Sequence, residues 1–110
     1  MSAPELQQRE VRVSKSARIK AFEFLRQNIP EAKIDDFQVL MDRINELILS
    51  GEKIDVGELV AELMDPKKFG LSQDIVEEFL KILVAGEADA DKLVAGTIEY
   101  AKRKMWRKTE

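Results

Sequence analysis

Apolar residues in this chain recur at intervals of three and four, the spacing that places side chains on one face of an α-helix. No segment alternates apolar and polar residues over the length of a strand. We therefore predict an all-α fold, a compact bundle of about five short helices. In the clearest helix, between Asp35 and Gly51, the apolar stripe comprises Phe37, Leu40, Met41, Ile44, Leu47 and Ile48.

Capping residues predict where the first two helices begin and end. Ser16 is a suitable N-cap for a helix that continues to Asn28, and Pro30 ends it because the residue before a proline avoids helical backbone angles. Asp35 is the expected N-cap of the second helix, which ends before Gly51.

Two further helices follow from the same kind of signal. Asp55, with Glu58 three residues later, resembles a capping box and opens a short third helix that stops at residues 65 and 66. Ser72 is the expected N-cap of a fourth helix that continues to Ala85. The apolar arc of this fourth helix is unusually wide, about 160° at about 100° per residue, which indicates the central helix of the bundle.

The last predicted helix extends from about Asp89 to Arg107, and residues 15 to 110 are expected to form a single helical domain. Residues 1 to 14 carry little apolar surface, so we predict a flexible N-terminal arm that orders on a partner. The apolar stripe of the last helix comprises Leu93, Val94, Thr97, Tyr100, Ala101 and Met105. Three apolar residues lie off the stripes of their helices and could meet a partner or a second copy of the chain: Phe24, Val39 and Leu49.

Charge is segregated along the chain. Residues 1 to 28 carry a net charge of +3, residues 29 to 99 carry −10, and residues 100 to 110 carry +4. The chain has no Cys and no His, which excludes thiolate and imidazole chemistry and the usual zinc sites. This pattern indicates binding and predicts neither an enzyme, nor a metal site, nor a cofactor.

The distribution of apolar residues also predicts where the protein works. No apolar run approaches the length of about 18 residues that spans a bilayer, and residues 1 to 8 lack the hydrophobic core of a signal peptide. We therefore expect a cytoplasmic protein without a membrane partner.

The best functional candidate is the basic end of the last helix. At about 100° per residue, Met105 continues the buried stripe while Trp106 falls on the opposite side, among cations. Lysine and arginine neutralise phosphates, and an indole can stack on an unpaired base, so this end is suited to single strands of RNA or DNA. The candidate contact residues are Lys102, Arg103, Lys104, Trp106, Arg107 and Lys108.

A second group of cations lies near the N-terminus. These residues would extend the basic surface if the first and last helices packed side by side. The group comprises Arg9, Arg12, Lys15 and Arg18. The alternative is that each charge run is solvated separately, and that the C-terminal cations complement the helix macrodipole or meet an acidic protein.

The segment from Ile54 to Gly86 resembles a helix-turn-helix of the winged or repressor type. The resemblance rests on Ile54 to Leu63, on Gly70-Leu71-Ser72, and on the apolar positions Val76 and Leu80. It implies DNA recognition by the fourth helix. Two features depart from that family: the turn is longer than the usual three or four residues, and the fourth helix exposes acidic residues that phosphates repel.

Together these features predict a non-enzymatic accessory subunit that contacts nucleic-acid backbone through its basic termini within a larger assembly. A protein-interaction adaptor with acidic and basic faces is the first alternative, and a helix-turn-helix regulator is the second. A homo-oligomer is compatible with each of them.

Overall fold

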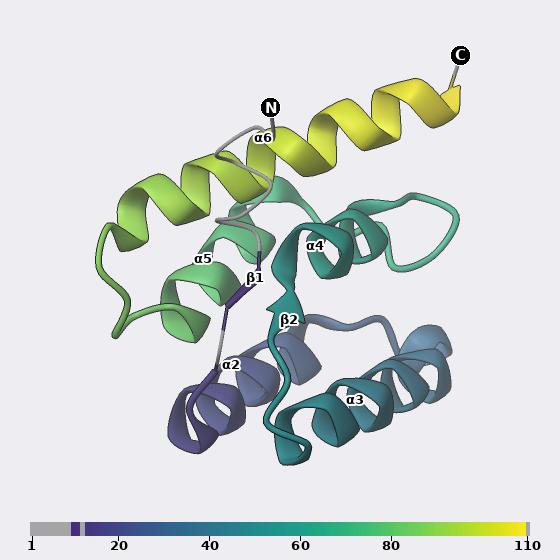
Figure 1. Ribbon diagram of the computed structural model, residues 1–110. Helices are drawn as coiled ribbons and strands as arrows, with labels where there is room; N and C mark the ends of the chain where they lie inside the picture. The colour runs from purple at the N-terminus through teal and green to yellow at the C-terminus, as the bar shows by residue number, and fades with distance from the viewer. Residues whose placement is uncertain (1–9, 12, 110) are drawn as a thin grey trace.

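The computed structural model describes residues 10, 11 and 13 to 109, and the side chains of residues 13 to 104. It confirms the expected all-α bundle (Figure 1). The described helices are α2 (Lys15–Asn28), α3 (Ile34–Leu49), α4 (Val56–Met64), α5 (Gln73–Leu83) and α6 (Ala90–Thr109), with a short 3-10 turn, η1 (Glu31–Lys33). In this part of the chain no helix is long and apolar enough to cross a membrane.

Helix α5 lies between α2 and α6, as the width of its apolar arc predicts (Figure 1). It packs most extensively on α2 and also contacts α6 and α4. The ring of Phe79, which is fully buried, stacks on Phe22 of α2 with 6.1 Å between ring centroids. Ser72 caps α5 as expected, because its hydroxyl accepts a hydrogen bond from the backbone N–H of Ile75 at 3.4 Å.

Helix α4 is buried on nearly all sides. Seven of its nine residues are buried, and the two that reach solvent are Glu58 and Glu62. Its predicted N-cap is confirmed, since the carboxylate of Asp55 accepts a hydrogen bond from the backbone N–H of Glu58 at 3.1 Å. A helix that is apolar all round needs neighbours on every face, and α4 packs most extensively against α6.

Two expected helix N-caps are wrong, each by two residues. Helix α2 is capped by Ser14, whose hydroxyl accepts a hydrogen bond from the N–H of Ala17 at 3.2 Å, while Ser16 lies inside the first turn. The earlier start adds a helical hydrogen bond from the N–H of Arg18 to the carbonyl of Ser14. Helix α3 continues directly from η1, so Asp35 is not a cap but a first-turn residue, where a carboxylate favours the helix dipole.

The bundle contains a short extended pair that the hydrophobic pattern does not indicate. Strand β1 (Glu10–Val11) pairs antiparallel with β2 (Ile54–Asp55), with Val11 opposite Ile54. Two-residue strands are too short to show an alternating pattern. This pair joins the chain before α2 to the start of α4, and the rest of the expected arm before residue 13 lies outside the described residues.

The off-stripe apolar residues differ in exposure. Val39 is 68% exposed and Leu49 is 86% exposed, as predicted, whereas Phe24 is half-buried against the core. Ile19 is also exposed, which the sequence pattern did not single out. On α6 the buried residues include four of the expected stripe and one that the prediction missed, Ile98: Leu93, Val94, Thr97, Ile98 and Ala101.

The observed cap of α2 leads to a direct test. We expect Ser14→Ala to lower the free energy of unfolding by about 1 kcal/mol, because it removes the side-chain acceptor for an N-terminal N–H group. Ser16→Ala, inside the helix, should change it by less than about 0.5 kcal/mol. Urea unfolding of both variants measures the difference, and the reverse order of effects would contradict the observed cap.

Candidate functional site

Helix α6 continues through its basic residues to Thr109, close to the expected end at Arg107. Lys102 and Arg103 are exposed, and the guanidinium of Arg103 lies 3.7 Å from the carboxylate of Glu99 one turn earlier. An exposed pair of this kind contributes little to stability, so both cations remain available to an anion. The side chains of Trp106, Arg107 and Lys108 lie outside the described side chains, and their predicted contacts stay predictions.

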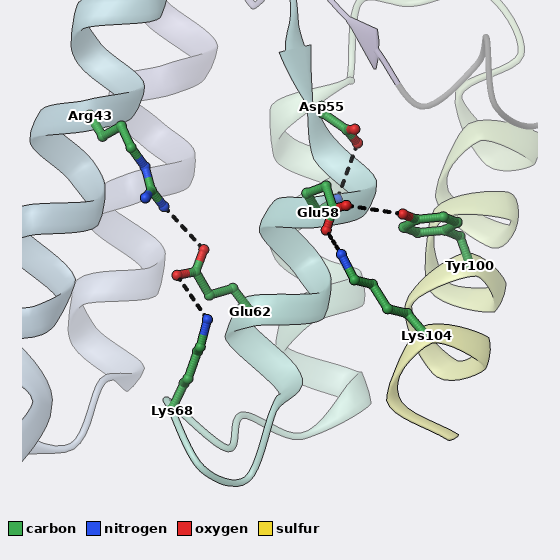
Figure 2. Close-up of polar contacts among 7 residues, drawn as sticks. All are labelled: Arg43, Asp55, Glu58, Glu62, Lys68, Tyr100 and Lys104. Carbon is green, nitrogen blue, oxygen red and sulfur yellow. Dashed lines mark hydrogen bonds and ion pairs between the residues drawn. The ribbon is translucent and has the colours of Figure 1, made fainter. Parts of the chain in front are cut away.

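Lys104 has a different environment from its two neighbours. Its ammonium group contacts the carboxylate of Glu58 on α4, and the hydroxyl of Tyr100 donates a hydrogen bond to the other oxygen of that carboxylate at 3.2 Å (Figure 2). The hydrogen bond to Glu58 raises the pKa of Lys104, against the smaller opposing effect of burial. Lys104, predicted as a phosphate contact, therefore joins α6 to α4.

The second carboxylate of α4 that reaches solvent, that of Glu62, points toward α3 and the loop after α4. Glu62 lies 3.2 Å from the guanidinium of Arg43 on α3 and 3.4 Å from the ammonium group of Lys68 in the loop after α4 (Figure 2). A concavity of about 270 Å³ connects the two carboxylates and is lined by Arg43, Lys68 and Lys104. Lys104 of α6 thus lines one concavity together with two cations of the middle segment, Arg43 and Lys68.

The N-terminal cations do not join this surface within the described residues. Helix α5 separates α2 from α6, so the first and last helices do not pack side by side (Figure 1). Lys15 is exposed at the start of α2, and the guanidinium of Arg18 donates a hydrogen bond to the side-chain oxygen of Asn45 on α3. Arg9 and Arg12 lie outside the described residues.

The sequence pattern did not identify Arg43 and Lys68, the cations that share a concavity with Lys104 of α6. The reason is that both lie in a segment with a strongly negative net charge. Residues 29 to 99 sum to −10, yet Arg43 and Lys68 come together on one face. In the sequence, the local feature that indicates this basic face is the adjacent pair Lys67 and Lys68, which follows α4.

The segment that resembles a helix-turn-helix has an arrangement unlike that of a DNA-reading pair. Helix α5 is covered by α2 on one side and by α6 on another. Its exposed residues include Gln73, Asp74 and Glu78, which would place carboxylates beside phosphates. The apolar positions Val76 and Leu80 are buried in the core.

Among the described side chains, no group of three or more carboxylate, His or Cys residues is placed so that it could hold a metal ion. The chain matches no protein-family model, and neither the curated proteins nor the solved structures contain a match.

The contact between Lys104 and Glu58 predicts a pH dependence of stability. Because the pKa of Lys104 is raised above its ordinary value of 10.5 in the folded protein, the contact contributes stability below about pH 10.5 and loses it as the pH rises through the folded value. We expect Lys104→Met to lower the free energy of unfolding at neutral pH by up to about 1 kcal/mol, since the pair is partly exposed.

The matched control is Lys102→Met, which changes an exposed lysine on the same helix. Chemical unfolding at neutral pH and above pH 10.5 should show that the difference between wild type and Lys104→Met shrinks at high pH. Equal behaviour of the two variants at both values would contradict a stabilising role for this contact.

Proposed function

We propose that this protein is a non-catalytic helical module that contacts the backbone of RNA or DNA through the basic end of α6, within a larger assembly. The observation that supports this proposal is that Lys102 and Arg103 are exposed near the end of a continuous helix, where the weak, exposed ion pair between Arg103 and Glu99 leaves both cations available to an anion. The proposal includes a cytoplasmic location for this module.

Electrostatic attraction predicts which residues would bind the phosphates of the nucleic acid. Phosphates attract Lys102 and Arg103, whose side chains are exposed, whereas Lys104 would first have to leave Glu58. The protein as a whole has a net charge of −3, so a polyanion is repelled except near this local surface. Binding should therefore be weak at high salt and confined to the end of α6.

Preference for single strands rests on Trp106, the single tryptophan of the chain. An indole that stacks on an unpaired base contributes about 1–3 kcal/mol per base, and paired bases in a duplex do not offer that face. Its emission also reports directly on binding at this end of the helix.

The test is a titration of Trp106 fluorescence with single-stranded and duplex oligonucleotides at two salt concentrations. We expect a change in emission that is larger for single strands and weaker at the higher salt concentration. The double variant Lys102→Gln/Arg103→Gln should bind more weakly. The slope of its log affinity against log salt concentration should become shallower by about 0.7 for each phosphate that the variant no longer neutralises.

The matched control is Lys92→Gln, an exposed lysine near the opposite end of α6, which should bind as the wild type does. No change in Trp106 emission with any oligonucleotide at low salt would overturn the proposal. A preference for one duplex sequence would favour the helix-turn-helix alternative.

A protein-interaction adaptor remains the second candidate. It is favoured by a specific observation, namely that Val39 and Leu49 on α3 are both largely exposed. An adaptor would show no oligonucleotide affinity above the nonspecific level.

A further inference from the structure

A groove lies between α3 and the loop that follows α4, with a volume of about 300 Å³. Its floor is apolar, because Leu40 of α3 and Phe69 of the loop lie there with their side chains largely buried. Val39, at 68% exposure, adds an apolar rim. Single exposed apolar residues are common on protein surfaces, but here one adjoins a concavity that has an apolar floor.

Apart from Val39, the residues around the apolar floor of the groove are charged, and most of them are basic. Four cations line it against two carboxylates, Asp36 and Glu62. Glu62 is already engaged by Arg43 and Lys68, so its charge is offset by these two neighbours. Lys33 and Lys67 remain beside the apolar floor. The groove is therefore locally positive within a segment whose net charge is −10.

We propose that this groove binds an acidic polypeptide segment that carries one large apolar side chain. The apolar side chain would lie on Val39, Leu40 and Phe69. Carboxylates on either side of it would pair with Lys33 and Lys67. The volume of the groove is at the low end of the range for ligand pockets, which suits one anchor residue and its flanking backbone.

The same observations disfavour two other occupants. A polynucleotide would place phosphates beside Asp36 and Glu62 and would leave the apolar rim at Val39 in water. A second copy that paired through α3 would bring Asp42 and Glu46 of the two copies together, and Arg43, the cation on the same face, is already paired with Glu62. Charge complementarity thus favours a different, acidic protein. The proposed anchor residues Val39, Leu40 and Phe69 are distinct from Lys102 and Arg103, although Arg43, Glu62 and Lys68 line both this groove and the concavity that reaches Lys104.

The probe for this site is a library of short random peptides displayed on phage, selected against the full chain. We expect the selected peptides to share one Phe, Leu, Ile or Trp flanked by Asp or Glu. For a labelled synthetic peptide of the selected sequence, replacement of the apolar residue by Ser should weaken binding about tenfold or more.

Two variants of the protein test whether the peptide binds in the groove. Val39→Asp should weaken binding of the labelled peptide about tenfold, because it removes an apolar surface and adds a repelling carboxylate. It should fold normally since Val39 is exposed. Lys67→Glu should weaken binding in the same direction. The matched control is Leu49→Asp, a comparable substitution of an exposed apolar residue on the same helix outside the groove, which should bind as the wild type does.

Several results would overturn the proposal. Selected peptides without acidic residues, or an equal weakening of binding in Leu49→Asp, would exclude a basic groove with an apolar anchor site. Weaker oligonucleotide binding by Val39→Asp would indicate a polynucleotide in the groove. Dissociation of a dimer by Val39→Asp in sedimentation would indicate a second copy.

The proposed nucleic-acid contact and the proposed peptide groove can be tested independently of each other. Lys102→Gln/Arg103→Gln should leave peptide binding unchanged, and Val39→Asp should leave oligonucleotide binding unchanged. Absence of either activity alone therefore identifies which surface was assigned wrongly.

Discussion

The burial of α4 is the constraint on which the rest of the structure depends. Seven of its nine residues are buried, and the two that reach solvent are Glu58 and the partly buried Glu62, one turn apart. Like charges at this spacing destabilise an isolated helix, so α4 depends on its neighbours both for packing and for counter-charges. Lys104 supplies the counter-charge from α6, while Arg43 and Lys68 supply it from α3 and the following loop.

This constraint divides the cations into two groups with different roles. Lys104 pairs with Glu58 and joins α6 to α4, whereas Lys102 and Arg103 face solvent and contribute little to the stability of the bundle. A count of charges along the sequence treats all of them alike. Residues of the second group are the ones whose charge can be used to bind a partner without a cost to stability.

The sequence predicts most of the helices because their signals are local. Asp55 and Ser72 lie at the observed caps of α4 and α5, and the wide apolar arc of α5 corresponds to its position between α2 and α6. The prediction of a helix start fails where two candidate N-caps differ little in free energy. Ser14 and Ser16 are both suitable caps, and the choice between them is made by a hydrogen bond of the first turn. At Asp35 the 3-10 turn before α3 removes the need for a cap.

The sequence by itself determined the all-α class, the approximate helix boundaries and the segregation of charge along the chain, since each depends on neighbours within a few residues. Only the tertiary structure decided which charges meet. It separated α2 from the basic end of α6 by α5, and it brought Arg43 and Lys68 to that end from a segment with a strongly negative net charge. The physical reason is that the position of a cation on the surface depends on which helix faces are buried, and that is settled by packing between residues distant in the sequence.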